Sequence, residues 1–227
     1  MKKFELTTDT KIFLGRKLFR IKALISFGNV RAGDMGGYIE KEENLSQFGD
    51  AWVYGDARVY GNAEVYGDAR VYGNAEVCGD ARVYGNAEVC GDARVYGDAR
   101  VYGNAEVCGD AWVCGDAWVY GDARVCGNAE VCGDAWVYGD ARVYGDARVY
   151  GNADYATASG FGSEFRTTTF FRLRNSSEIG VKCGCFYGTI KEFREKVKET
   201  HGETKKAKEY LMLADLMEYR FSEENKA

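Results

Sequence analysis

Proline is absent from this chain of 227 residues, and histidine occurs once, as His201. Because proline cannot donate a backbone hydrogen bond, its absence suits an uninterrupted ladder of β-strands. No apolar run approaches the roughly 20 residues that a membrane-spanning helix needs. The first residues also lack the apolar stretch of a signal peptide, so we expect a cytoplasmic protein that makes no contact with a membrane.

Positive charge is also scarce where a nucleic-acid-binding protein would need it. The net charge is −5, with an acidic central part between two mildly basic flanks. Proteins that bind nucleic acid typically carry a basic patch or stripe. The charge distribution therefore argues against nucleic acid as a partner.

The dominant feature of the sequence is a run of seventeen consecutive six-residue units from Gly49 to Tyr150. Each unit spells Gly, then Asp or Asn, then Ala, then Arg, Glu or Trp, then Val, and finally Tyr or Cys. An eighteenth, degraded unit occupies 151–156. A repeat of this regularity decides the architecture before any other pattern is weighed.

Within each unit, Ala and Val alternate with other residues at the period of two that is typical of a half-buried strand. The Gly-Asp or Gly-Asn pair supplies a corner, because these residues tolerate left-handed backbone angles. Three short sides and three corners make a triangular turn of 18 residues, and stacked turns form parallel sheets. We expect Ala and Val to point inward, with the residue between them and the Tyr or Cys pointing outward.

A Val followed four positions later by a small residue resembles the hexapeptide repeat of left-handed parallel β-helices. The resemblance covers 49–156 and implies a mainly β fold, namely a single left-handed parallel β-helix of about six triangular turns. The left hand follows from the resemblance alone and runs against the usual crossover rule. Around it we expect an N-terminal β cap with a first imperfect turn over 1–48, and a C-terminal ββαα cap over 157–227.

The C-terminal cap is predicted from two kinds of pattern. Thr167–Arg174 and Ile179–Phe186 are typical of a β-hairpin. Thr189 opens a capping box before a helix over Ile190–Thr200, and a second helix is expected over about Lys205–Phe221.

The segment that leads into the repeat, with Val30–Asp34, Gly36–Ile39 and Leu45–Gln47, is similar to the start of YdcK-like proteins. These are bacterial and prophage-carried hexapeptide-repeat proteins. The tail around Thr167–Phe170 and Cys183–Phe186 is similar to the tails of phage and prophage versions. The resemblance implies a β-helix but brings no established substrate, cofactor or catalytic residues. We therefore expect no cofactor and carry no site over from the family.

An acyltransferase of the hexapeptide class is the alternative function. Such enzymes generally use a histidine as general base, at a groove between the subunits of a trimer. His201 lies outside the repeat, where we interpret it as a residue that interacts with a helix dipole. Zinc-dependent members of the class need several histidines, which this chain lacks. We therefore lean towards a protein that is not an enzyme.

Six of the eight cysteines occupy the repeat position that elsewhere holds tyrosine, and we interpret them as free thiols. Five of them stack at the period of 18 in two columns: Cys90, Cys108 and Cys126 in one, and Cys114 and Cys132 in the other. We place neighbouring turns at the outer limit of disulfide reach. Cys183 and Cys185 are expected on one side of a buried strand, as small apolar residues without a metal.

The charged residues of the repeat follow a rule. Asp at the second position precedes Arg or Trp two residues on, whereas Asn precedes Glu, or Asp154 in the degraded unit. The rule keeps like charges apart and permits Asp–Arg pairs inside a unit, which would stabilise the fold by about 0–1 kcal/mol each. Duplication of a few ancestral units explains the same rule.

The tryptophans are the most informative departures from the repeat. With residues 18 apart stacked, one side carries an unbroken column of Tyr beside a column that contains two Arg and two Trp. The candidate site on this side comprises Arg82, Arg100, Tyr102, Trp118, Tyr120, Trp136 and Tyr138. Trp52 and Trp112 lie alone on the other two sides. Contiguous aromatic surface typically marks a contact site, and the alternative is stacking that only stiffens the coil.

We therefore predict a non-enzymatic binding or structural β-helix protein of phage or prophage type. Its contacts are expected through the aromatic side. Three kinds of partner stay open: a sister subunit in a homo-oligomer, a host protein, or a small planar or anionic ligand held with the help of Arg82 and Arg100.

Overall fold

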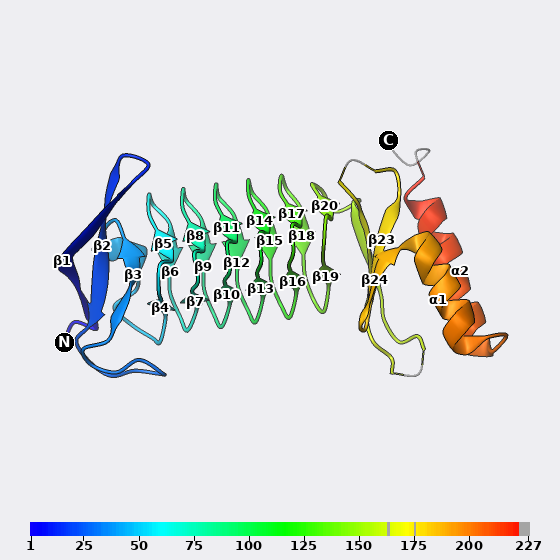
Figure 1. The fold of residues 1–227 in the computed structure, drawn as a ribbon, viewed down its shortest axis with the longest axis horizontal. Coiled ribbons are helices and arrows are strands. Elements are labelled where there is room, and N and C mark those ends of the chain that lie inside the picture. Colours follow the sequence, from blue (N-terminus) through cyan, green and yellow to red (C-terminus); the bar gives the residue numbers. More distant parts are fainter. Residues whose placement is uncertain (163, 175, 223–227) are drawn as a thin grey trace.

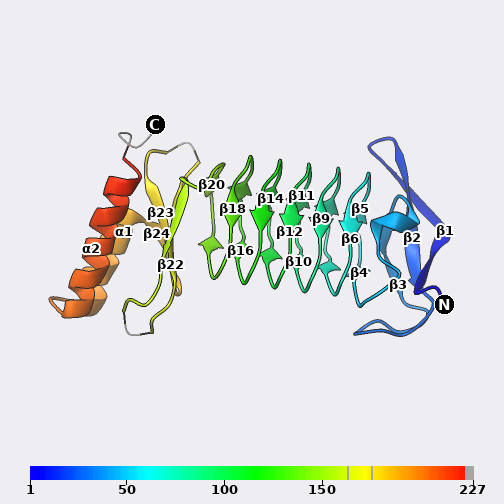
Figure 2. The same ribbon diagram turned by 180° about the vertical axis from the view of Figure 1, so that it is seen from behind.

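The computed structural model describes residues 1–162, 164–174 and 176–222, and it shows an elongated molecule with three successive parts (Figure 1). Antiparallel strands form one end, a coil of short strands forms the middle, and two helices cover the other end. The view from behind shows the same order (Figure 2). The fold is mainly β, with a parallel β-solenoid of about six turns at its centre.

Three sheets run along the solenoid, and each contains every third short strand. One sheet holds β4 (Trp52–Val53), β7 (Arg70–Val71), β10 (Glu88–Val89), β13 (Glu106–Val107), β16 (Arg124–Val125) and β19 (Arg142–Val143). A second holds β6 (Glu64–Val65), β9 (Arg82–Val83), β12 (Arg100–Val101), β15 (Trp118–Val119) and β18 (Trp136–Val137).

The third sheet has nine strands and joins the solenoid to the N-terminal part. It begins with β1 (Phe4–Phe13), β2 (Arg16–Ala23) and β3 (Met35–Ile39), and continues through β5 (Arg58–Val59), β8 (Glu76–Val77), β11 (Arg94–Val95), β14 (Trp112–Val113), β17 (Glu130–Val131) and β20 (Arg148–Val149). β1–β3 pair antiparallel, and β3 pairs parallel with β5. The antiparallel strands therefore end in a strand that is already part of the coil.

The core of the solenoid is a dry column of small side chains. Every Ala and Val of the seventeen units is buried, and none is more than 1% exposed. The register is exact at 18 residues, as in the pairing of Val83 with Val101 and of Val101 with Val119. The inward orientation predicted for Ala and Val is confirmed.

The corners depend on glycine for two reasons. Gly67 has a φ of +71°, and a Cβ on it would lie 2.9 Å from the backbone nitrogen of Gly85 in the next turn. Both the left-handed angle and the close approach exclude other residues. The neighbouring Asn and Asp side chains also form ladders, as where Asn62 Nδ2 donates to Asp80 Oδ1 at 3.0 Å.

Charged residues pair between turns and not within a unit. Arg58 contacts Glu76 at 2.9 Å, and Arg124 contacts Glu106 at 3.4 Å. Within 49–156, all of which the structure describes, no arginine forms an ion pair with the Asp of its own unit. The predicted Asp–Arg pairing is therefore wrong. Neighbouring parallel strands lie only about 5 Å apart, so the Glu directly opposite in the neighbouring turn is the closer partner for each of these arginines.

The N-terminal part covers the first turn of the solenoid with buried side chains. Trp52 is only 1% exposed, and its ring lies 6.2 Å from that of Phe4 and 5.4 Å from that of Phe27. The repeat alone does not predict this burial, because the residues that cover Trp52 come from the N-terminal part. The short 3₁₀ helix η1 (Glu42–Asn44) follows β3 and precedes the first repeat unit.

Lys3 caps the open backbone at this end. It is 2% exposed, and its Nζ donates to the carbonyl oxygens of Ala51 at 2.9 Å and Gly49 at 3.3 Å. Burial lowers the pKa of Lys3 to about 8, against the opposing pull of Asp50 and Asp68. An ammonium group therefore satisfies carbonyl groups that would otherwise end the ladder without a donor.

The C-terminal part is a four-stranded antiparallel sheet covered by two helices. Its strands are β21 (Tyr155–Ala158), β22 (Thr168–Arg172), β23 (Ile179–Cys183) and β24 (Phe186–Thr189), and its helices are α1 (Ile190–His201) and α2 (Lys205–Arg220). The expected hairpin is β22 with β23, and the sheet contains two strands more than the hairpin. In the described part of the chain, neither helix is long and apolar enough to cross a bilayer.

Individual side-chain contacts explain the helix start and the packing in the C-terminal part. Thr189 and Glu192 form the predicted capping box, with the Glu192 carboxylate accepting from the Thr189 backbone at 2.7 Å. Phe170 and Phe193 pack edge-on at 6.2 Å and join the sheet to α1. β23 ends at Cys183, and Cys185 lies in the following turn, so the prediction that both thiols share one side of a strand is wrong.

Candidate functional site

The outward tyrosines of the five-stranded sheet form a continuous stack. The distances between ring centroids are 4.8 Å for Tyr66 and Tyr84, 4.8 Å for Tyr84 and Tyr102, 4.9 Å for Tyr102 and Tyr120, and 5.4 Å for Tyr120 and Tyr138. The planes of neighbouring rings deviate by at most 16°. The period of 18 therefore brings all five rings onto one side, as the sequence predicts.

Two tryptophans stand beside this stack in the neighbouring column. Trp118 and Trp136 lie parallel at 5.1 Å, and Tyr102 meets Trp118 edge-on at 6.3 Å. The Arg100 guanidinium lies 4.7 Å from the Trp118 ring, at cation–π distance. Arg82 instead turns to Glu64, 3.9 Å away. We call this surface the aromatic face; it comprises Tyr66, Arg82, Tyr84, Arg100, Tyr102, Trp118, Tyr120, Trp136 and Tyr138.

Exposure of the aromatic face increases towards the C-terminal part. The tyrosines of the first turns and Trp118 are half-buried, whereas Trp136 is 43% and Tyr138 is 52% exposed. Burial, reinforced by the neighbouring tyrosines, raises the pKa of Tyr102.

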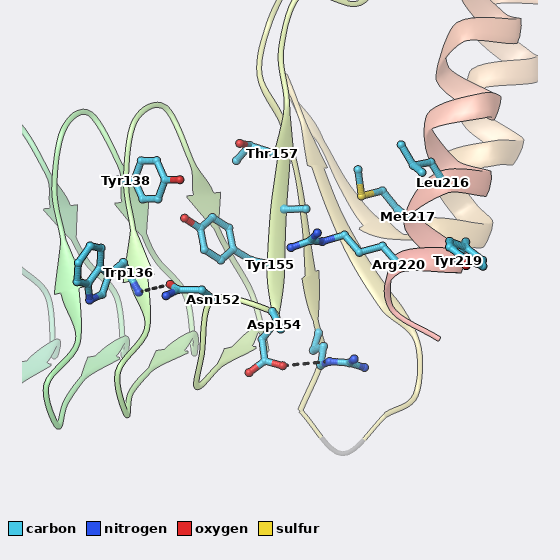
Figure 3. Close-up of a pocket in the computed structure, with 13 residues that line it drawn as sticks. Trp136, Tyr138, Asn152, Asp154, Tyr155, Thr157, Leu216, Met217, Tyr219 and Arg220 are labelled. Atoms are coloured by element: carbon cyan, nitrogen blue, oxygen red, sulfur yellow. Dashed lines mark hydrogen bonds and ion pairs between the residues drawn. The ribbon is translucent and has the colours of Figure 1, made fainter. Parts of the chain in front are cut away.

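The aromatic face ends in an open cleft between the last turns of the solenoid and the C-terminal part (Figure 3). The cleft holds about 1050 Å³. Its lining comprises Trp136, Tyr138, Asn152, Ala153, Asp154, Tyr155, Ala156, Thr157, Arg172, Leu216, Met217, Tyr219 and Arg220. Eight of these residues are aromatic or aliphatic, and five are polar or charged, so the wall offers both ring surface and polar groups.

Polar contacts fix the geometry of the cleft. The backbone N–H of Trp136 donates to Asn152 Oδ1 at 2.9 Å, and Arg172 Nε contacts Asp154 Oδ1 at 3.0 Å. Tyr155 is buried, and burial raises its pKa to about 12. The degraded unit 151–156 thus supplies the floor of the cleft. Its departure from the repeat is the feature of the sequence that points to this position.

Trp112, the isolated tryptophan of β14, lies on a different sheet from the aromatic face. It is half-buried, with the Tyr96 ring edge-on at 6.4 Å and the Arg94 guanidinium at 5.4 Å. Trp52 is buried against the N-terminal part, as described above. Outside the aromatic face, Trp112 is therefore the partly exposed tryptophan of the shaft that can be compared with Trp136.

A second cleft, of about 580 Å³, lies against α1 and β23 and includes His201. His201 is the last residue of α1, as predicted, and its ring stacks on that of Tyr210 at 5.9 Å. Cys183 and Cys185 line the same cleft, and Thr168 Oγ1 donates to Cys183 Sγ at 3.2 Å. No sequence pattern connects the histidine with the thiols, because only the packing of α1 against β23 and the turn after it brings them to one cleft.

Four of the six shaft cysteines form disulfides, so the prediction of free thiols throughout is wrong. Cys108 bonds to Cys126 and Cys114 to Cys132, with Cα–Cα distances of 4.7 and 4.5 Å. These distances lie at the short end of the range that disulfides span, not at its outer limit. Cys78, Cys90, Cys183 and Cys185 are free.

The stacked short strands and their 18-residue register define a β-solenoid repeat protein. Three stretches of the chain, residues 87–103, 93–109 and 141–153, match the family described as "YdcK Beta solenoid repeat". All three stretches lie in the solenoid, so the similarity concerns its repeats. A comparison with curated proteins gives no match.

Proposed function

We propose that this β-solenoid is a non-enzymatic binding module and that a small planar ligand stacks on Trp136 in the cleft. The observation that carries the proposal is the end of the tryptophan column. The next position of the column, Asp154, pairs with Arg172 at 3.0 Å, so the column of rings stops at Trp136 at the mouth of the cleft. A planar ring in the cleft would continue the stack at the spacing that the protein's own rings keep.

The lining of the cleft supports a ligand that is planar and partly polar. Trp136 and Tyr138 offer ring surface, and Met217 offers a polarisable thioether that packs well against rings. Asn152 and Arg172 bring polar groups to the same wall. Stacked aromatic pairs gain about 0.5–1.5 kcal/mol beyond the area they bury. The proposal includes the phage or prophage origin and the cytoplasmic location that the sequence suggests.

The test compares two single substitutions of partly exposed tryptophans, Trp136→Ala and Trp112→Ala. Full-length protein isolated from its own host is examined by native mass spectrometry for a retained small molecule. Flavin mononucleotide and adenosine monophosphate then serve as planar probes in fluorescence titrations. We expect Trp136→Ala to lose about two- to tenfold in affinity and Trp112→Ala to keep the wild-type value, since the free energy of one stacked pair corresponds to a factor in that range.

Equal behaviour of the two variants would refute a ligand site at Trp136. If Trp136→Ala instead shifts the sedimentation coefficient while leaving probe binding intact, the aromatic face is a contact with a sister subunit. Loss of a co-purifying host protein in Trp136→Ala alone would assign the face to that partner.

Acyl transfer at the solenoid remains the alternative class. The one histidine of the chain lines the second cleft, next to α1, and not the shaft where such enzymes keep their base. We expect no acetyl-CoA turnover that depends on His201, measured on a panel of amines and alcohols with wild type and His201→Ala. Turnover abolished by this substitution would overturn the proposal of a non-enzymatic protein.

A further inference from the structure

Three cysteines lie in one column on the six-stranded sheet, on a different side from the aromatic face. Cys90, Cys108 and Cys126 follow β10, β13 and β16, whose valines pair in register. Backbone hydrogen bonds of 2.9 Å hold neighbouring turns together here, one from Cys90 to Val107 and one from Cys108 to Val125. Cys108 therefore has a cysteine on each side of it along the column.

Cys108 uses one of these neighbours in the disulfide with Cys126. On its other side, in the preceding turn, lies Cys90, and Glu106 lies two residues before Cys108 in the same turn. The two sulfur atoms and a carboxylate oxygen of Glu106 all lie within 4.8 Å of one another, and the three residues are half-buried. Within the described residues, this is the one group of three or more His, Cys, Asp and Glu side chains that meets so closely.

We propose that Cys90, Glu106 and Cys108 bind a zinc-like divalent ion when the Cys108–Cys126 disulfide is reduced, and that the disulfide closes this site. Thiolate and carboxylate are ligands that zinc takes in proteins. Two sulfurs bound tetrahedrally to one zinc lie roughly 3.8 Å apart, given Zn–S bonds of about 2.3 Å. Side-chain rotation therefore has to bring the two sulfurs closer by at most about 1 Å. Because the site is half-buried, water completes the coordination.

The opening step is a two-electron reduction by a dithiol. The dithiol attacks the Cys108–Cys126 bond and leaves as a cyclic disulfide, and its two protons end on the sulfurs of Cys108 and Cys126. The ion then displaces one proton from Cys90 and one from Cys108, while Cys126 keeps its thiol. Metal binding therefore releases two protons, as thiolate coordination requires.

The carboxylate of the site already has a cation beside it before an ion binds. Arg124 lies 3.4 Å from Glu106 and neutralises the carboxylate in the closed state. The ion thus replaces one cation beside Glu106 and supplies the positive charge that two thiolates need.

The second disulfide of the shaft offers an internal comparison. Cys114 and Cys132 bond to each other, and the column positions next to them hold Tyr96 and Tyr150. The corresponding carboxylate, Glu130, is buried and contacts Arg174 and the Tyr150 hydroxyl. This pair therefore lacks a third thiol, and its carboxylate is buried and held by two groups, whereas Glu106 is half-buried and contacts Arg124.

The experiment uses the full chain with Cys114 and Cys132 replaced by Ser, so that one shaft disulfide remains. Co²⁺ is the probe, since thiolate coordination gives it a charge-transfer absorption band. We expect one equivalent of Co²⁺ to bind after treatment with a dithiol and desalting under argon, and none before. Adding Cys126→Ser should allow the same binding without reductant, and adding Cys90→Ser should abolish it in both states.

A matched pair of acidic residues tests the carboxylate. Glu106→Gln should weaken Co²⁺ binding by more than tenfold, because it removes a ligand, and the loss of a group that only hydrogen-bonds to a ligand already costs about 10- to 100-fold. Glu88→Gln, one turn away in the same column, should leave the affinity unchanged. The proposal fails if the Cys126→Ser protein shows no thiolate–Co²⁺ band, or if Cys90→Ser binds as its parent does. Circular dichroism verifies that each variant is folded.

Discussion

Replacing Val101 by Asp should unfold the solenoid from its centre. Val101 is fully buried in β12, between Val83 and Val119 of the adjoining turns. The substitution forfeits the burial of the valine side chain, about 1.5–3 kcal/mol. It also places a carboxyl group without a partner in an apolar column, at about 2–7 kcal/mol. The lower limits together already remove a large share of the roughly 5–15 kcal/mol that stabilises a typical domain.

The loss of stability should also depend on pH, with a defined sign. Burial raises the folded-state pKa of the new carboxyl above its unfolded value of about 3.9. The folded state then binds the extra proton between these two pKa values, so the free energy of unfolding falls as pH rises through that window. Val101→Asn carries a similar polar shape without a titrating group and should show no such dependence.

The assay is urea unfolding at pH 5 and pH 8, followed by circular dichroism, for wild type, Val101→Asp, Val101→Asn and Val101→Ala. Val101→Ala isolates the cost of the cavity. A Val101→Asp protein as stable as wild type would refute the dry core. A stability loss in Val101→Asp that matches Val101→Asn at both pH values would refute a buried, titrating carboxyl.

Two further outcomes are expected at the N-terminal end. Because the pKa of Lys3 is about 8 in the folded protein and 10.5 ordinarily, the unfolded state binds more protons between these values. The free energy of unfolding should therefore rise with pH across this window, by at most about 1.4 kcal/mol per pH unit, and Lys3→Met should remove the rise in urea titrations at pH 7.5 and 10. Trp52→Ala should cost about 3–5 kcal/mol of unfolding free energy in urea, whereas Trp112→Ala should cost under about 1 kcal/mol, and equal costs would contradict the burial of Trp52.

The architecture follows from the sequence wherever one strict period decides the environment of a residue. Ala and Val at fixed positions of each unit predict the buried column, and the 18-residue stacking predicts which tyrosines and tryptophans meet. Trp52 escapes this logic because Phe4 and Phe27 cover it, and no repeat connects those residues to it. The ion pairs also escape a reading of single units, because Arg58 contacts Glu76 in the next turn and not a residue of its own unit.

The candidate site was predictable only on its solenoid side. Trp136 and Tyr138 follow from the period, but Arg172 and Met217 reach the cleft through the antiparallel sheet and α2. Their position depends on how the sheet packs on the last turn, as in the bridge between Ala147 and Leu173. Residue spacing carries no information about such a junction.

Because the shaft is a coil of three-sided turns, the number of its units determines how its two ends are oriented around the shaft axis. Each unit advances the chain by one side of a triangle, so the angle around the axis between the two ends depends on the remainder when the number of units is divided by three. One unit inserted after Trp136 would carry Tyr155 and Arg172 to the neighbouring side, away from the indole. Three inserted units would restore the direction and separate the same groups by a full turn. Duplications that lengthen this protein while keeping its ends aligned must therefore come in threes.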